Sequence, residues 1–221
     1  MEKERSTKII AIVALVVAVV GLSVGFAAFS KDLNITFSES SVTPGGSLDL
    51  KFVVSEDDTA GTNKTVAAKL NNGATAANDA TIAGDASSIS GLSATFTNKG
   101  QSVDYDFYIY NASEYDAYLR KVTFENYNGQ NTNKVCTAIG STNAELVANA
   151  CNDITLSISV GGENVTSTLE DGFSTPEIEH SKTIPVKVTI SYNGDNLLPN
   201  GDFKINFGAI KLSYSSLASS N

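Results

Sequence analysis

The sequence lacks most of the residues around which enzyme active sites are built. It has one histidine, two cysteines, one methionine and no tryptophan in 221 residues. It contains no H-E-x-x-H, no G-x-S-x-G, no glycine-rich phosphate loop and no Cys-His cluster. A hydrolytic zinc needs about three protein ligands plus an open position. His180 beside Glu177 and Glu179 is a poor start for such a site, and we interpret it as part of a solvated loop. We therefore expect no enzyme, with no catalytic residues, no metal and no cofactor.

Basic residues are also few, since 15 Lys and Arg stand against 24 Asp and Glu. This acidic balance keeps a protein soluble and repels phosphate backbones, which argues against nucleic acid or anionic lipid as a partner. Two stretches, Glu56–Asp58 and Asn193–Asn196, contain oxygen ligands suited to calcium, but neither has the spacing of a helical calcium loop. We interpret both as solvated turns.

The chain has one long hydrophobic run, at its start. Ile9 to Phe29 are 21 residues without a charge, and Lys3, Arg5 and Lys8 precede them. This order predicts an export signal. A helix of that length would reach roughly 31 Å, close to the ~30 Å hydrocarbon thickness, so a retained membrane anchor is the alternative. In both cases the rest of the chain is expected to work outside the membrane.

Cleavage after Ala27 is favoured over cleavage after Ala28. A signal peptidase prefers small side chains at the first and third positions before the cut. A cut after Ala27 places Gly25 and Ala27 there, whereas a cut after Ala28 would place bulky Phe26 at the third position. Residues 1–27 are therefore predicted to be a signal peptide.

The mature chain, residues 28–221, is predicted to be a single secreted domain. At this length a domain buries about 70% of its unfolded surface, which is enough for a real core. Its formal charge is near −10, because the removed segment contains three of the 15 basic and two of the 24 acidic residues. Cys136 and Cys151 favour one disulfide in an exported chain, contributing on the order of 3 kcal/mol, and two free thiols are the alternative.

Period-two alternation of apolar residues recurs through the mature region, and helical periodicity almost never does. Such alternation predicts half-buried antiparallel strands. The alternating sets are Leu33–Phe37, Leu48–Val54, Val103–Ile109, Ile154–Val160, Ile184–Tyr192, Phe203–Phe207 and Ile210–Tyr214. The predicted fold class is all-β, an antiparallel jelly-roll or immunoglobulin-like β-sandwich with one short helix, preceded by the hydrophobic signal helix.

Four features interrupt the strand pattern. The phase of the alternation flips around Gly208, which predicts a β-bulge there. Pro185 cannot donate to a ladder, so the start of its strand should lie at an edge or at an unpaired position. The one helical candidate is Ser141–Ala150, between the two cysteines. Residues 55–90 are rich in small and polar side chains, which predicts a long polar insertion with two weak strands.

Tyrosines are concentrated in one part of the chain. Six of the eight fall between Tyr105 and Tyr127. Tyr108 and Tyr110 belong to the strand face opposite the core, which makes them a candidate interaction surface. An exposed tyrosine suits a protein or glycan contact, because its ring supplies rigid area and a polar tip. Burial under a loop or a second sheet is the alternative.

Two short stretches carry motifs of a known protein family. Gly25–Ser30 is similar to a Gly-x-(Trp/Phe)-Ala-x-Phe ending of a signal segment. Gly100–Phe107, continuing to Asn111 and Tyr115–Leu119, is similar to a Gly-Asp-x-x-x-x-x-Phe…Asn-x-Gly-x-x-x-x-x-Leu hairpin, with Gln101 where Asp is frequent. These parts of the chain resemble the TasA and camelysin family, which Gram-positive bacteria secrete. The resemblance implies a jelly-roll-like sandwich and, in fibre-forming members, biofilm matrix filaments assembled by donor-strand exchange.

The leading interpretation is a secreted structural subunit of extracellular fibres or biofilm matrix, which forms filaments with itself and contacts other matrix or cell-surface components. The mature start, Ala28–Phe37, would be the donor strand, with Leu33, Ile35 and Phe37 facing one way into a neighbour's groove. If the hydrophobic start is retained, the alternative is a membrane-tethered adhesion or binding module at the cell surface. A camelysin-like secreted peptidase is a third hypothesis, although no zinc-site pattern carries it.

Overall fold

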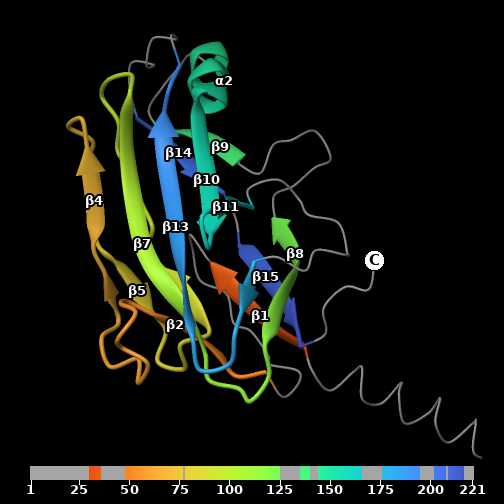
Figure 1. Ribbon diagram of the computed structural model, residues 1–221. Coiled ribbons are helices and arrows are strands. Elements are labelled where there is room, and N and C mark those ends of the chain that lie inside the picture. Colours follow the sequence, from red (N-terminus) through yellow and green to blue (C-terminus); the bar gives the residue numbers. More distant parts are fainter. Residues whose placement is uncertain are drawn as a thin grey trace, which may run out of the picture.

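Antiparallel β-strands make up most of the described chain (Figure 1). The computed structural model describes residues 30–35, 48–76, 78–124, 135–139, 144–165, 176–194, 202–207 and 209–216. Among the strand pairs found there, the only parallel one joins β1 (Ser30–Ile35) to β6 (Ser88–Ser90). The same residues contain one short helix, α2 (Ala144–Asp153). The prediction of a mostly β, antiparallel fold with one short helix is confirmed.

Two larger sheets and one small sheet contain these strands. The six-stranded sheet has the order β11 (Glu163–Asn164), β10 (Ile154–Val160), β13 (Thr183–Tyr192), β7 (Gln101–Asn111), β2 (Leu50–Val53), and β4 (Ala68–Asn71) pairs with β7 beside β2. The seven-stranded sheet has the order β12 (Glu177–Ile178), β8 (Ala117–Phe124), β15 (Ile210–Ser215), β1, β6, β5 (Ala80–Ile82), β3 (Thr65–Val66). The small sheet pairs β9 (Val135–Ile139) with β14 (Asp202–Asn206).

The two larger sheets share one hydrophobic core. Along β7 every second residue is buried, and β13 shows the same alternation. Phe52 of β2 and Phe107 of β7 pack edge to face, with ring centroids 5.5 Å apart. Leu119 and Leu212, from the seven-stranded sheet, belong to the same buried cluster. This arrangement is the reason for the period-two pattern, because each long strand turns one face to the shared core.

Helix α2 lies close to its expected position. The structure places it at Ala144–Asp153, where the sequence predicted Ser141–Ala150, and residues 141–143 lie outside the described residues. The helix leads directly into β10, which begins at Ile154 (Figure 1).

Residues 55–90 differ from the expected polar insertion with two weak strands. They contain four short strands, β3 to β6, which join both larger sheets. β2 and β4 pair with successive parts of β7, so they act as two halves of one edge strand. Between them the chain crosses to the seven-stranded sheet, where β3 pairs with β5. Composition concealed these strands because they are two to four residues long and place only Val66, Ala80, Ile82 and Ile89 in the core.

The change of phase near Gly208 is a change of sheet rather than the predicted bulge within one strand. β14 ends at Asn206 and pairs with β9, whereas β15 begins at Ile210 and pairs with β8 and β1. Gly208 itself lies outside the described residues. β15 pairs irregularly with β8. The register shifts between Ser213 and Tyr214, so that Arg120 of β8 has no opposite residue in β15. A change of phase is compatible with a bulge and also with a break between two strands, so alternation alone does not separate them.

Pro185 pairs with Tyr108 of β7 on one side and, as predicted for the start of its strand, has no strand partner on the other. β13 lies between β10 and β7, but its pairing with β10 ends at Val186. The Pro185 carbonyl accepts a hydrogen bond from the Gly161 amide at 2.8 Å, beyond the end of β10. The missing N–H of proline therefore interrupts no ladder bond.

Two buried tyrosines differ in how their hydroxyls are satisfied. The Tyr105 hydroxyl donates to the Ser93 carbonyl at 2.9 Å and accepts from the Ser93 amide at 3.0 Å. The Tyr214 hydroxyl is the one buried side-chain polar atom, among the described residues, that has no hydrogen-bond partner. Burial also raises the pKa of Tyr214 far above its ordinary value. The Tyr214 hydroxyl is therefore buried at a cost that nothing around it offsets.

Tyr214→Phe is expected to raise the free energy of unfolding by about 1 kcal/mol, because it removes an unsatisfied buried hydroxyl. Tyr105→Phe is the matched control and should lower it by about 1 kcal/mol, because two hydrogen bonds are lost. Urea unfolding of both variants measures the difference. Effects of the same sign would contradict the contrast between the two hydroxyls.

Candidate functional site

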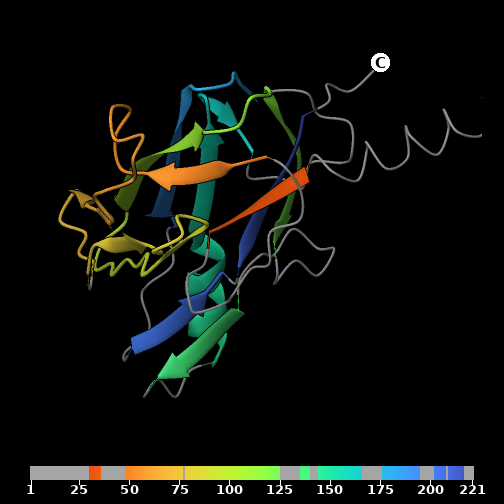
Figure 2. The ribbon, with the colours of Figure 1, turned by 90° about the horizontal axis from the view of Figure 1, so that it is seen from below.

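The predicted donor strand occupies an internal position in the seven-stranded sheet. β1 pairs with β15 over six residues, from Ser30 opposite Ser215 to Ile35 opposite Ile210, and with β6 at two residues. Leu33 stands opposite Leu212, and both Leu212 and Ile210 are completely buried. Figures 1 and 2 both show β1 beside β15, at the N-terminal end of the described chain. β1 is therefore the first described strand and yet fills the middle of a sheet.

Both edges of this sheet are short or guarded in the described chain. At one edge β12 pairs with β8 only at Ala117 and Tyr118. Farther along, β8 carries the unpaired Arg120 and the exposed Lys121. Bulges and charged side chains are common means of preventing an edge strand from pairing with another chain. At the other edge β3 is two residues long.

Tyr108 and Tyr110 lie on the outer face of the six-stranded sheet and are half-buried. Register places Tyr108 between Val53 of β2 and Pro185 of β13. Neither tyrosine makes a side-chain hydrogen bond to another described residue, and no described layer covers them completely. The candidate interaction surface at these two tyrosines stays a prediction.

Asp104 joins three strands on the same face. Its carboxylate accepts hydrogen bonds from Lys187 Nζ at 2.8 Å, Thr189 Oγ1 at 2.7 Å and Asn71 Nδ2 at 3.2 Å. These donors belong to β13 and β4, which flank β7. Burial acts to raise the pKa of Asp104, but hydrogen bonds from Lys187 and Thr189, with the Lys187 charge, outweigh burial and hold that pKa below its ordinary value.

Asp104→Asn is expected to lower the free energy of unfolding at neutral pH by about 1–2 kcal/mol, since charge-assisted hydrogen bonds become neutral ones. The depressed pKa in the folded state means that the contribution of Asp104 is present above its unfolded pKa and is lost as pH falls through the folded pKa. The difference between wild type and variant should therefore shrink below about pH 4. Urea unfolding across this pH range measures it, with exposed Glu163→Gln as control. A pH-independent difference would contradict the assignment.

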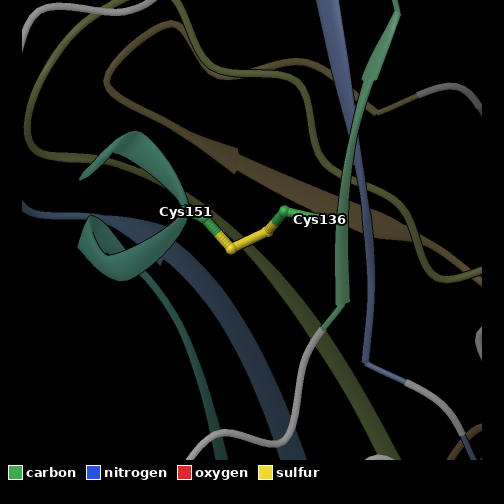
Figure 3. Close-up of a disulfide and its surroundings, with 2 residues drawn as sticks. All are labelled: Cys136 and Cys151. Carbon is green, nitrogen blue, oxygen red and sulfur yellow. A yellow bond between two sulfur atoms is a disulfide. The ribbon is translucent and has the colours of Figure 1, made fainter. Parts of the chain in front are cut away.

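The structure contains the predicted disulfide between Cys136 and Cys151 (Figure 3). Their Cα atoms are 6.2 Å apart, within the usual range for a disulfide. The bond links β9 to α2, and both cysteines are partly exposed. The alternative of two free thiols does not hold in this structure.

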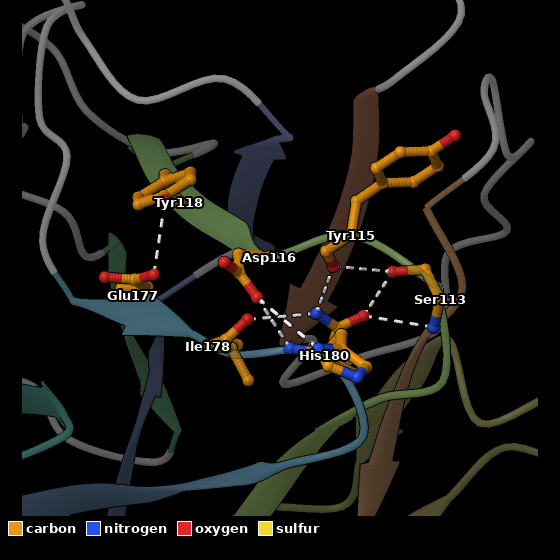
Figure 4. A network of polar contacts seen from close by, with 8 residues as sticks. Ser113, Tyr115, Asp116, Tyr118, Glu177, Ile178 and His180 are labelled. Atoms are coloured by element: carbon orange, nitrogen blue, oxygen red, sulfur yellow. Dashed lines mark hydrogen bonds and ion pairs between the residues drawn. The ribbon is translucent and has the colours of Figure 1, made fainter.

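A polar cluster connects the turn after β7 to the segment before β13 (Figure 4). Asn111 is buried, and its Nδ2 donates to the carbonyls of Tyr115 at 2.7 Å and Ile178 at 2.9 Å. Its Oδ1 accepts from the Ser113 amide at 3.1 Å and from the Ser113 hydroxyl. The hydrogen-bonding capacity of this amide is satisfied inside the fold, so Asn111 is structural. A glycosylated side chain would not fit there, although Asn111-Ala112-Ser113 has the acceptor pattern.

His180 lies at the rim of this cluster with its side chain 65% exposed. Its backbone amide donates to Asp116 Oδ1 at 2.9 Å, and its Nδ1 lies 3.9 Å from the same oxygen. This surface contact agrees with the interpretation of a solvated loop. Throughout the described ranges, no group of three or more His, Cys, Asp or Glu is placed to hold a metal ion.

Gln101 has a structural role that the sequence did not reveal. It is buried, and its Oε1 accepts from the amides of Thr97 at 2.6 Å and Asn98 at 2.9 Å. Its Nε2 donates to the Asn72 carbonyl at 3.1 Å. One side chain thus fixes the turn that leads into β7 and links it to the turn after β4. In the sequence, the only signal for this role of Gln101 was a polar residue directly after Asn-Lys-Gly.

Several predicted residues lie outside the described residues. They include the hydrophobic run Ile9–Phe29 with Ala27 and Ala28, and the last donor residue, Phe37. In the portion that the structure describes, no helix has the length and hydropathy to cross a membrane. Export, cleavage after Ala27 and the retained anchor all stay predictions.

Comparisons of this chain with protein-family models, curated proteins and solved structures find no match. The resemblance to the TasA and camelysin family stays a prediction that rests on Gly25–Ser30 and Gly100–Leu119. The function is therefore inferred from the arrangement of the strands.

Proposed function

We propose that the chain is a secreted, non-enzymatic subunit of extracellular fibres or biofilm matrix that assembles by donor-strand pairing. The observation that supports this function is the internal position of β1, the first described strand, between β15 and β6. β15 and β6 form the two sides of this position. β1 of a neighbouring subunit can therefore occupy it in the same register. Exchange of an identical terminal element is a low-cost route from monomers to assemblies.

An empty β1 position would be costly. Without β1, the backbone groups of β15 and β6 that face it have no partners, and burial of Leu212 and Ile210 is incomplete. A strand with the same alternation restores both the ladder and the burial. The position therefore accepts a strand with the alternation of β1, which a neighbouring copy of the chain supplies.

Chain length allows β1 to reach a neighbour. Twelve residues, 36–47, join β1 to the rest of the domain. Fully extended, they would span up to about 40 Å, comparable to the width of a small domain. Successive exchange from one subunit to the next is an open, head-to-tail contact, which produces a filament instead of a closed dimer.

For the fold, we propose a jelly-roll-like β-sandwich made of the two larger sheets. The shared core between them supports this architecture. The resemblance of the signal end and of the β7–β8 hairpin to the TasA and camelysin family is consistent with it.

Deletion of residues 28–37 tests the function. The truncated protein is expected to form no filaments by electron microscopy, because it can accept a strand but cannot donate one. A synthetic peptide of residues 28–37 should bind the truncated protein and raise its thermal unfolding temperature. A peptide with Leu33 and Ile35 replaced by Asp is the control and should not. Filaments that persist after the deletion would refute the donor role.

A membrane-tethered binding module is the second candidate, and the accessible pair Tyr108 and Tyr110 favours it. Mass spectrometry of the exported protein separates the two proposals. An N-terminus at Ala28 supports release, whereas an intact Met1 supports the tether. The double variant Tyr108→Ser with Tyr110→Ser should leave filaments unchanged if β1 alone drives assembly.

A further inference from the structure

β9 and β14 form a two-stranded sheet of their own, called the ribbon below (Figure 2). Five residue pairs, from Val135 opposite Asn206 to Ile139 opposite Asp202, join the two strands. In the described chain, neither strand pairs with a strand of the larger sheets. An isolated two-stranded sheet is at best marginally stable in water. The ribbon therefore depends on a further attachment to keep its place.

The disulfide provides such an attachment (Figure 3). Cys136 lies in β9, and Cys151 lies in α2 two residues before the helix ends. α2 continues into β10, where Ile154 and Leu156 are buried in the core of the larger sheets. The bond thus fixes one strand of the ribbon to a segment that is anchored in that core. The other strand of the ribbon, β14, is connected to the seven-stranded sheet by the short chain segment that leads to β15.

The helix surface next to the disulfide is apolar. Val147 and Ala150 are 6% and 0% exposed, yet neither belongs to the core that the two larger sheets share. Cys151 follows Val147 by four residues, so the two side chains lie on the same face of the helix. β9 is in contact with α2. Separation of the ribbon from the helix would remove this contact between β9 and α2.

We propose that the Cys136–Cys151 disulfide is a redox-sensitive latch, which holds the ribbon on α2 and which thiol reductants open while the two larger sheets stay folded. Both sulfur-bearing residues are partly exposed, so a small thiol can reach the bond. A thiolate attacks one sulfur and forms a mixed disulfide, and a second thiol displaces the protein thiol. The net change converts one protein disulfide into two thiols and two reductant thiols into one disulfide.

Hydrogen exchange tests the latch in the mature protein, before and after reduction with dithiothreitol. Alkylation of both cysteines, read by mass, verifies complete reduction. Amide exchange in 135–139 and 202–206 should become faster by on the order of a hundredfold, the change expected from removing a disulfide that closes a loop of this size. Exchange in β7, β10 and β13 should stay the same.

The double variant Cys136→Ser with Cys151→Ser should show the fast ribbon exchange without reductant, and dithiothreitol should then have no further effect. Unchanged ribbon exchange after complete alkylation would overturn the latch. Simultaneous loss of protection in all strands would also overturn it, because the disulfide would then stabilise the whole fold. Hydrogen exchange is measured on the monomer. Neither result therefore bears on donor-strand assembly, which has separate tests.

Discussion

Joining β1 to β15 with an engineered disulfide, Asn34→Cys with Lys211→Cys, is expected to abolish filament formation while the monomer stays folded. Asn34 and Lys211 stand directly opposite each other in the antiparallel pairing. The Cβ atoms of such opposite residues are about 4.5–5.5 Å apart, so a disulfide forms with a small adjustment. A strand fixed in its own fold cannot be donated. Electron microscopy and light scattering of the oxidised protein measure the loss.

The order of oxidation and assembly makes this test specific. Oxidation before assembly should yield cross-linked monomers that remain single. Oxidation after assembly should yield covalent multimers, because in the filament the cysteine introduced into β1 of one subunit faces the cysteine introduced into β15 of the next. A ladder of bands on a denaturing gel without reductant reports these multimers. The two single variants are the controls and should assemble like the wild type.

Filaments formed by protein whose engineered β1–β15 disulfide has been verified by peptide mass would contradict the donor role. The same holds if cross-linking of finished filaments gives only monomers. In either case assembly would have to use another surface, and the face with Tyr108 and Tyr110 would be the next to test. The double cysteine variant thus distinguishes strand exchange from association of intact domains.

Alternation in the sequence predicted the long strands because each has one face in the shared core. β7, β10 and β13 lie where the apolar residues alternate, and the period is evident over seven or more residues. For residues 55–90 the sequence predicted two weak strands without bounds, where the structure has four, since two to four residues give no measurable period. Their pairing partners decide their structure, and those partners lie elsewhere in the chain.

The sequence also did not reveal which sheet each strand joins. The change of phase before Ile210 marks the transfer of the chain from the ribbon to the seven-stranded sheet, and the same pattern fits a bulge. β1 could be recognised as extended, but its place between β15 and β6 depends on segments more than fifty residues away. The disulfide was predictable, because a chain with two cysteines offers a single pairing and the predicted export favours oxidation.

The buried polar residues were the least predictable part of the structure. Gln101 and Asn111 stand at the two ends of β7, where polar side chains normally indicate solvent. The Asn111 amide bonds to a carbonyl 67 residues away, which no local pattern encodes. Such residues become recognisable only when the backbone groups around them are known.

Asn111→Ala is expected to lower the free energy of unfolding by about 3 kcal/mol, among the larger effects of a single substitution in this chain. The amide Nδ2 donates to two carbonyls, of Tyr115 and Ile178, and the Oδ1 accepts from Ser113 (Figure 4). Alanine leaves these buried groups without their partner and also leaves a small void. Because Ile178 belongs to β12, the short strand at the edge of the sheet should lose protection first.

Ser113→Ala is the matched control for this prediction. It removes one hydroxyl but keeps both Nδ2 bonds and the amide bond to Oδ1, so we expect a loss of about 1 kcal/mol. Urea unfolding measures both variants, and hydrogen exchange of residues 177–182 locates the change. Equal losses for the two variants would mean that the hydroxyl, and not the Asn111 amide, holds the turn. We expect the larger loss for Asn111→Ala because the Asn111 amide, unlike the Ser113 hydroxyl, bonds to a segment that is distant in the sequence.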